Sequence, residues 1–157
     1  MKNITAIAHV ALKVKDIERS LAFYRTVLEF KEMLRLENPV GGLFLVYLRV
    51  TDTQYLELFP DAVGDQAPGA DAMGVHHFCL EVDNLDDAVR HLIEKGADTF
   101  VEWIQGEVQV SPSPVVNTGR DGNRQCWMID PDGNRIELME MGSNSLQRRA
   151  IQRLRGE

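Results

Sequence analysis

Hydrophobic and polar residues alternate in two short segments that resemble each other. Residues 7–14 and 75–82 place apolar side chains at every second position, which is typical of a β-strand with one buried face. His-Val-Ala-Leu-Lys-Val at 9–14 matches His-Phe-Cys-Leu-Glu-Val at 77–82, and Tyr-Leu-Glu-Leu at 55–58 matches Arg-Ile-Glu-Leu at 135–138. The chain therefore contains an internal repeat, and its second copy is longer by about a dozen residues.

Each copy continues with a predicted helix. Asp16 is expected to cap the first helix, and Asp83 or Asn84 the second, because their side chains accept hydrogen bonds from the first free backbone N–H groups. Gly96 is expected to end the second helix in the left-handed conformation. The apolar stripes that would face the core are Ile17, Leu21, Tyr24 and Leu28 in the first helix and Leu85, Val89, Leu92 and Ile93 in the second.

Three further strands are predicted after each helix. They lie at residues 31–37, 42–50 and 54–59 in the first copy and at 99–103, 124–129 and 134–141 in the second. Asp-Pro-Asp-Gly at 130–133 is a strong turn signal, so the last two strands should form a hairpin. The extra residues of the second copy are assigned to an inserted loop in the Pro-rich stretch 104–117.

These elements predict an α+β fold of two tandem βαβββ modules, which form a curved mixed sheet with helices on its outer side. Module 1 spans residues 4–60 and module 2 spans 74–141, and together they make one domain over residues 4–141. The segment between the modules is rich in Gly, Ala, Asp and Pro, as expected of an exposed linker. Residues 143–157 are expected to form a helical tail that packs on the sheet or on a second subunit.

Composition excludes two classes of partner. The net charge of −7 argues against a nucleic-acid binder, which needs a positive field, although the tail is locally basic. No apolar stretch approaches the roughly 20 residues that a membrane-spanning helix needs. No export signal is recognisable at the N-terminus, so a cytoplasmic location is expected. Cys79 and Cys126 lie in apolar runs, and each is expected to be reduced and buried.

Four polar side chains interrupt the apolar strands at equivalent places. They are His9 and Glu57 in the first copy and His77 and Glu137 in the second. Alternate residues of a strand share a face, so all four are expected on the face turned away from the helices, whereas His76 would face the opposite way and play no part. Imidazole and carboxylate together suit divalent ions such as Ni²⁺, Co²⁺, Zn²⁺, Fe²⁺ and Mn²⁺. The repeated pairs predict a metal site; the alternative is a polar lining that binds no metal.

Longer runs around these residues resemble the glyoxalase I branch of the vicinal oxygen chelate superfamily. The matching runs are Ile-Ala-His-Val-Ala-Leu-Lys-Val at 7–14, Ser-Leu-Ala-Phe-Tyr at 20–24, Val-His-His-Phe-Cys-Leu-Glu-Val at 75–82 and Ile-Asp-Pro-Asp-Gly-Asn-Arg-Ile-Glu-Leu at 129–138. The resemblance covers residues 4–141 and implies the glyoxalase/bleomycin resistance/dioxygenase fold. It also implies a homodimer and one divalent ion per site: Ni²⁺, Co²⁺ or Zn²⁺, with Mn²⁺ and Fe²⁺ as further candidates.

Glu57 narrows the choice within the superfamily. Extradiol dioxygenases and fosfomycin-modifying thiol transferases of this fold hold their metal with residues equivalent to His9, His77 and Glu137 alone. Methylmalonyl-CoA epimerases usually carry glutamine at the position of Glu57, whereas short bacterial glyoxalase I enzymes carry glutamate. The resemblance therefore implies a lactoylglutathione lyase-like metalloenzyme. In such an enzyme Glu137, or Glu57 as the second choice, moves a proton next to a carbonyl group.

The substrate implied by this resemblance is the hemithioacetal of methylglyoxal and glutathione. Candidate anchors for its anionic groups, each of which is otherwise a solvated surface residue, are Arg35, Arg49, Arg120 and Arg124. Two alternatives remain open: an isomerase or epimerase of a non-thiol hydroxycarbonyl or CoA-ester substrate, and a non-catalytic small-molecule-binding protein of the superfamily. The residues also leave open the metal, the identity of the base, and whether the site lies within one chain or across a dimer.

Overall fold

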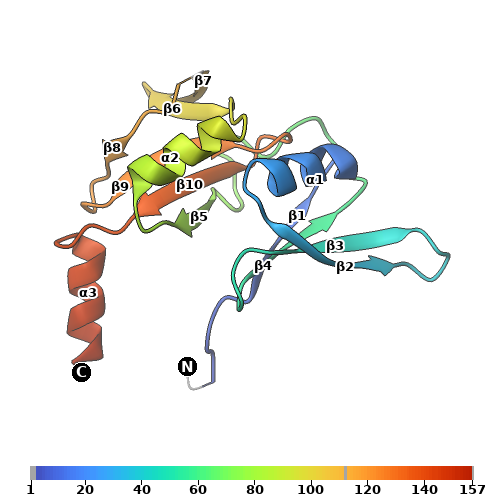
Figure 1. Cartoon of the computed structure of the whole chain (residues 1–157), viewed down its shortest axis with the longest axis horizontal. Coiled ribbons are helices and arrows are strands. Elements are labelled where there is room, and N and C mark those ends of the chain that lie inside the picture. The colour runs from blue at the N-terminus through green and yellow to red at the C-terminus, as the bar shows by residue number, and fades with distance from the viewer. Residues whose placement is uncertain (1–2, 112, 157) are drawn as a thin grey trace. The chain divides into compact units, whose positions relative to one another are not determined.

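The computed structural model describes residues 3–111 and 113–156 of the chain (Figure 1). The chain forms two compact units, Met1–Ala67 and Pro68–Glu157, and each contains one copy of the sequence repeat. Each unit has its own mixed sheet together with one or two helices, so the predicted α+β class is confirmed.

The first unit has the predicted order βαβββ. Its elements are β1 (His9–Lys13), α1 (Ile17–Thr26), β2 (Lys31–Glu37), β3 (Leu43–Arg49) and β4 (Tyr55–Phe59). The strands lie in the order β1-β4-β3-β2, with β1 parallel to β4 and the other pairs antiparallel. The first and last strands of the copy are therefore neighbours, which brings residues far apart in the sequence side by side.

The second unit repeats this topology and adds to it. Its elements are β5 (Phe78–Glu81), α2 (Leu85–Glu94), β6 (Phe100–Ile104), β7 (Glu107–Ser111), β8 (Asn117–Thr118), β9 (Arg124–Ile129), β10 (Arg135–Glu140) and α3 (Leu146–Arg155). The order β5-β10-β9-β6 reproduces β1-β4-β3-β2, and β5 is again parallel to β10. Strand β7 extends the sheet beyond β6, and the short β8 pairs with β9.

The extra residues of the second copy lie where the sequence placed them, but part of them is a strand rather than a loop. β7 forms a hairpin with β6, so the prediction of an inserted loop is wrong for residues 107–111. Gln105 and Gly106 make the turn, with φ of 53° and 90°. Two consecutive residues with positive φ give the tight hairpin turn whose twist matches that of the flanking strands.

The helix boundaries follow the predicted capping residues. The side chain of Asp16 accepts a hydrogen bond from the backbone of Arg19 at 3.1 Å. Asn84, rather than Asp83, caps α2 by accepting a hydrogen bond from the backbone of Asp87 at 2.9 Å. Gly96 follows α2 with a φ of 88°, as predicted for a residue in the left-handed conformation.

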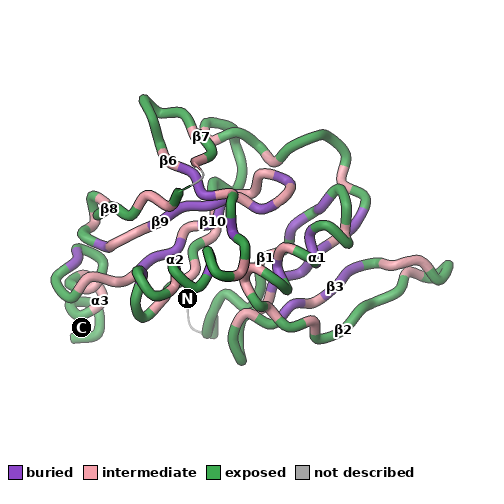
Figure 2. Tube along the Cα trace, turned by 45° about the horizontal axis from the view of Figure 1, so that its top comes forward, coloured by how far each residue is buried: buried purple, intermediate pink, exposed green. Residues whose placement is uncertain are grey.

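Apolar side chains from the helix and the central strands form the core of each unit. Val14, Val46 and Leu58 are completely buried in the first unit, and Figure 2 shows buried stretches along β3, β9 and β10. Helix α2 packs on β9 and β10. Its predicted stripe is buried except for Ile93, which is 49% exposed, so the stripe is narrower than predicted.

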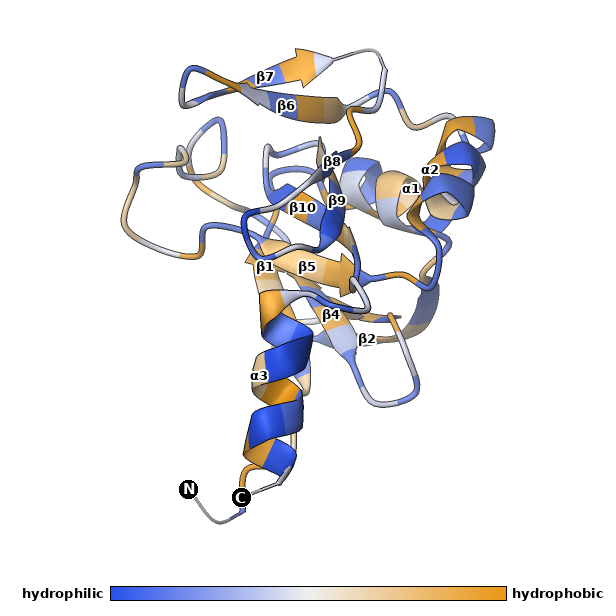
Figure 3. Cartoon of the chain, turned by 90° about the vertical axis from the view of Figure 1, so that its left-hand side faces the viewer, coloured by the Kyte–Doolittle hydropathy of each residue, from blue (hydrophilic) through white to orange (hydrophobic). Residues whose placement is uncertain are grey.

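Helix α3 is the helix predicted for the tail. Apolar and polar residues alternate along it in Figure 3, and none of its residues is buried. Leu146 and Leu154 are 56% and 62% exposed. No helix in the described part of the chain is long and apolar enough to cross a membrane.

Candidate functional site

The second unit brings His77 and Glu137 together. Glu137 in β10 lies opposite Cys79 in β5, and His77 comes two residues before Cys79. The Nε2 atom of His77 is 3.0 Å from Oε2 of Glu137. The two side chains are 31% and 13% exposed, so the pair is largely covered but remains in contact with solvent.

The first unit contains the same arrangement. Glu57 in β4 lies opposite Ala11 in β1, and His9 comes two residues before Ala11. The Nδ1 atom of His9 is 3.7 Å from Oε1 of Glu57, and the side chains are 48% and 8% exposed. Each repeat therefore places its predicted histidine and glutamate at the same relative register, with Glu57 enclosed between the buried Leu56 and Leu58.

An aromatic residue lies opposite each glutamate on the neighbouring antiparallel strand. Tyr47 in β3 pairs with Glu57, and Trp127 in β9 pairs with Glu137. The Tyr47 hydroxyl is hydrogen-bonded to Glu57, and this contact raises the pKa of the tyrosine. The indole of Trp127 instead packs against the ring of His77, with a centroid distance of 4.8 Å. Sequence analysis missed both residues, although each occupies the same position within its repeat.

Cys79 was predicted to be buried, and this prediction is wrong. Cys79 is exposed, whereas Cys126 is buried as expected. Within β5, Cys79 lies opposite Glu137 of β10, so it is a neighbour of the proposed site rather than of the core. Burial around the thiol group and the charge of Glu137, which also forms a hydrogen bond with it, raise the pKa of Cys79 to about 12.

His76 was expected to face away from His77, and the structure corrects this. The two Nδ1 atoms are 2.7 Å apart. Strand alternation does not apply here, because β5 begins only at Phe78. The ring of His76 also stacks on Trp103 of β6, with centroids 5.4 Å apart and an interplanar angle of 10°. His76 therefore belongs to a cluster of aromatic rings beside the His77–Glu137 pair.

The model of the Glyoxalase/Bleomycin resistance protein/Dioxygenase superfamily matches residues 6–138. The chain belongs to this superfamily. The predicted resemblance to glyoxalase-type proteins is thereby confirmed at the level of family and fold.

Individual relatives within the superfamily have different activities. Methylmalonyl-CoA epimerase from Homo sapiens is 33% identical over 109 residues, which cover 66% of this chain and 61% of the epimerase. The match thus spans less than two thirds of that relative. Lactoylglutathione lyase from Salmonella typhimurium is 30% identical over 137 residues, which cover 85% of this chain and 91% of the lyase.

A solved structure of the superfamily supports the fold. The glyoxalase family protein from Enterococcus faecalis superimposes with a TM-score of 0.66 at 22% identity, covering 86% of this chain and 97% of that protein. At this identity the likeness establishes the fold alone.

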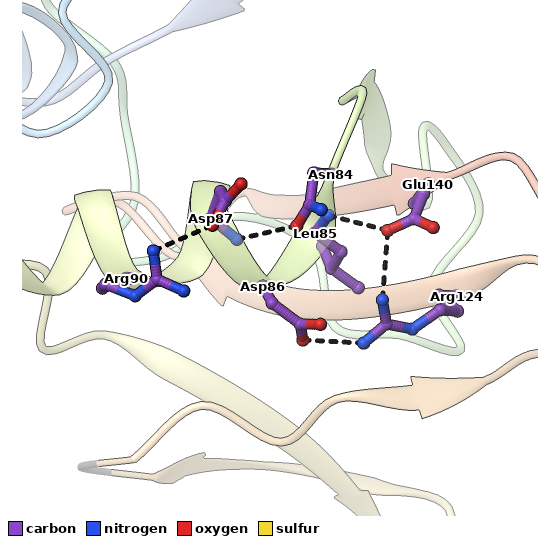
Figure 4. Close-up of polar contacts among 7 residues, drawn as sticks. All are labelled: Asn84, Leu85, Asp86, Asp87, Arg90, Arg124 and Glu140. Carbon is purple, nitrogen blue, oxygen red and sulfur yellow. Dashed lines mark hydrogen bonds and ion pairs between the residues drawn. The ribbon is translucent and has the colours of Figure 1, made fainter.

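Arg124, one of the predicted substrate anchors, forms two ion pairs at the start of α2 (Figure 4). Its Nη2 atom is 2.7 Å from Oδ1 of Asp86, and its Nη1 atom donates to Oε2 of Glu140 at 3.1 Å. The same Glu140 oxygen accepts the backbone N–H of Leu85 at 2.8 Å. Arg124 therefore links the end of β10 to the first turn of α2.

The other three predicted anchors lie on exposed surface. Arg35 is paired with Glu32 at 2.8 Å and with Glu18 at 3.5 Å, and Arg49 is paired with Asp52. Arg120 is exposed in the turn before β9. Arg35 and Arg49 are thus each paired with a neighbouring carboxylate, so an anionic ligand would have to compete with these partners.

The four predicted ligands fit a divalent ion by their chemistry. Two imidazoles and two carboxylates are donors that borderline divalent ions accept, and each pair is already within 4 Å. Among the described residues, no group of three or more histidine, cysteine, aspartate or glutamate side chains gathers that could hold a metal. Each unit by itself therefore supplies two donors, half of the predicted set.

Proposed function

We propose that this protein is a metal-dependent enzyme that transfers a proton at a carbon atom next to a carbonyl group, in the manner of lactoylglutathione lyase. The repeated histidine–glutamate pair carries the proposal. A single pair is a common structural feature, but the same pair at the same register in both repeats is typical of a ligand set. The two relatives named above are a lyase and an epimerase.

In this proposal His9, Glu57, His77 and Glu137 together hold one divalent ion, such as Ni²⁺, Co²⁺, Zn²⁺, Mn²⁺ or Fe²⁺. When bound, the ion would draw negative charge from the substrate oxygens and so make the neighbouring C–H bond more acidic. The side chains supply the remaining chemistry.

We propose Glu137 as the base and Glu57 as the fixed member of the pair. The side chain of Glu57 is 8% exposed and is held by the Tyr47 hydroxyl, a good hydrogen-bond donor. Glu137 is 13% exposed, and the thiol of Cys79 beside it is a weak donor. Its contact with Nε2 of His77 at 3.0 Å would be released as a hydrogen bond when that nitrogen binds a metal. Glu137 is therefore the carboxylate with more freedom to take a proton from carbon and return it to a neighbouring atom.

Epimerisation of a CoA ester is the second candidate, and the 33% identity to methylmalonyl-CoA epimerase favours it. That reaction needs the same step, removal and return of a proton beside a carbonyl. The glutamate at position 57 favours the lyase, since the epimerases of this fold usually carry glutamine there.

The two substrates can be compared directly. The protein is freed of metal, reconstituted with Ni²⁺, Co²⁺ or Zn²⁺ in turn, and assayed with the methylglyoxal–glutathione hemithioacetal and with methylmalonyl-CoA. We expect turnover of the hemithioacetal, with a loss of at least about 100-fold in Glu137→Gln. His91→Ala, a histidine change in α2, serves as the control and should leave the rate unchanged.

Turnover of methylmalonyl-CoA alone would select the epimerase. If the metal-bound protein turns over neither substrate but exchanges a substrate C–H proton for deuterium from D₂O, the proton-transfer step survives and the substrate assignment fails. Absence of exchange and turnover with every metal would favour a non-catalytic binding protein. The homodimer implied by the resemblance and the expected cytoplasmic location stay predictions.

A further inference from the structure

Both ring nitrogens of His77 have a partner. On one side Nε2 lies 3.0 Å from Oε2 of Glu137, and on the other Nδ1 lies 2.7 Å from Nδ1 of His76. The second distance is that of a hydrogen bond, so one of the two Nδ1 atoms carries a proton and the other accepts it. The contacts at its two nitrogen atoms thus fix the orientation of the His77 ring.

The ring of His76 is itself held in place. It stacks on Trp103 with an interplanar angle of 10°, and the edge of Trp127 approaches it with centroids 6.4 Å apart. The backbone carbonyl of His76 accepts a hydrogen bond from Nε of Arg135 at 2.7 Å. Arg135 is 7% exposed and also donates to the carbonyl of Pro68 at 2.9 Å. A fixed backbone and a stacked ring make His76 a defined partner for His77.

When Nε2 of His77 binds a metal, the position of the remaining ring proton decides which of the two histidines donates the hydrogen bond. A neutral imidazole that uses Nε2 as a ligand carries its proton on Nδ1. Nδ1 of His76, 2.7 Å away, is placed to accept that proton. A hydrogen-bond acceptor behind a ligand histidine fixes its tautomer and ring orientation, and its loss typically weakens metal binding by 10- to 100-fold.

The first repeat provides an internal comparison. The residue before His9 is Ala8, so that copy has no side chain equivalent to His76. The hairpin strand β6, which supplies Trp103, is also extended by β7 only in the second unit. The side-chain contact that supports His77 is therefore specific to the second repeat.

We propose that His76 is a positioning residue that holds the imidazole of His77, by accepting its Nδ1 proton, in the tautomer and orientation that Nε2 needs to bind the metal. The inference rests on the proposed role of His77 as a ligand. It predicts that the two histidines of the proposed metal site are supported differently: His77 by another histidine, and His9 without an equivalent partner at position 8.

Three variants separate hydrogen bonding from packing. His76→Asn keeps an acceptor near the position of Nδ1, and His76→Phe keeps the stack on Trp103 but has no acceptor. His91→Asn is the matched control for loss of a histidine elsewhere. The affinity of each full-length variant for Zn²⁺ and Co²⁺ is measured by competition with a chromophoric chelator, and thermal unfolding confirms that each is folded.

We expect His76→Phe to bind Zn²⁺ about 10- to 100-fold more weakly than wild type, and His76→Asn to remain within about threefold. Unchanged affinity in His76→Phe would overturn the proposal. Equal losses in His76→Asn and His76→Phe would also overturn it, because the effect would then come from packing.

A second readout distinguishes failure of this inference from failure of the proposed function. Nitrogen-15 NMR of the imidazoles reports the tautomer of His77 directly. If the wild-type protein binds no metal, the proposed function fails. In the Zn²⁺-bound protein, a hydrogen-bonded Nδ1 proton of His77 in wild type and His76→Asn that is lost in His76→Phe would establish the positioning contact, and the same Nδ1 signal in all three proteins would overturn it.

Discussion

His77 lies one residue before β5 and is not opposite Glu137 in the pair of β5 and β10, and yet Nε2 and Oε2 are 3.0 Å apart. Glu137 faces Cys79, and the histidine reaches it diagonally from two residues earlier. The same diagonal relation holds between His9 and Glu57. Because β1 and β4, like β5 and β10, are the first and last strands of their copies, the topology of the repeat itself creates each pair.

Alkylation of Cys79 should be slow although the residue is exposed. Desolvation of the thiol by the groups packed around it and the charge of Glu137 raise the pKa of Cys79 to about 12, so very little thiolate is present at pH 8. In the Cys126→Ala background, where Cys79 is the only cysteine, we expect iodoacetamide to react about 100-fold more slowly than with an ordinary cysteine. Mass spectrometry follows the reaction, and the rate should still rise with pH above 9.

The same measurement tests the contact between Cys79 and Glu137. Glu137→Gln removes the negative charge beside the thiol, which should lower the pKa of Cys79 and speed up alkylation. Glu81→Gln is a useful control, because Glu81 is a smaller contributor to the pKa of Cys79 and should have less effect. If the two variants react at equal rates, Glu137 is not the charge that raises this pKa.

Glu140 should contribute measurably to stability. Its Oε2 atom accepts the backbone N–H of Leu85 and a bond from Arg124, and its side chain is 28% exposed (Figure 4). Glu140→Ala leaves the first turn of α2 without this acceptor, so we expect it to lower the free energy of unfolding by about 1–2 kcal/mol in urea titrations.

The exposed pair of Arg90 and Asp87 on the same helix provides the comparison. Both side chains are 65% exposed, so Arg90→Ala should cost less than about 0.5 kcal/mol. An equal or larger loss in Arg90→Ala would mean that the network around Glu140 does not anchor the helix.

Asn123 should be the most sensitive polar position near the tail. It is 1% exposed, its Nδ2 donates to Asp121 at 2.6 Å and to Gln147 at 2.9 Å, and its Oδ1 accepts the N–H of Gly142 at 3.0 Å. Asn123→Ala leaves these groups unpaired and should lower the free energy of unfolding by about 2 kcal/mol. Gln109→Ala, at an exposed position of β7, should change it by less than about 0.5 kcal/mol. A near-zero cost for Asn123→Ala would show that water replaces these contacts.

The repeat and the order of its elements were predictable because both depend on local patterns. Alternation marked the strands, and Asp16 and Gly96 marked helix ends. Strand β7 was missed because the prolines around it suggested a loop. Its signal, an alternating Glu-Val-Gln-Val after Gln105-Gly106, is short and lacks the more typical Asn-Gly turn.

The surroundings of the candidate site were less predictable, since they depend on register and on strand ends. Tyr47 and Trp127 lie opposite the two glutamates only because of the pairing between strands, which the sequence does not state. His76 was misplaced because strand alternation was extended beyond the start of β5. The two histidine–glutamate pairs could be anticipated from the internal repeat, which places each histidine and each glutamate at equivalent positions.

The most direct test of the account is the amount of metal bound when one pair is broken at a time. Wild type, His9→Ala, His77→Ala and the control His91→Ala are reconstituted with Zn²⁺, freed of loosely bound ions, and analysed by inductively coupled plasma mass spectrometry. We predict one equivalent per chain in wild type and the control, and loss of most of it in both His9→Ala and His77→Ala. Full occupancy in either ligand variant, or two equivalents in wild type with one lost in each, would contradict a single site shared by the two pairs.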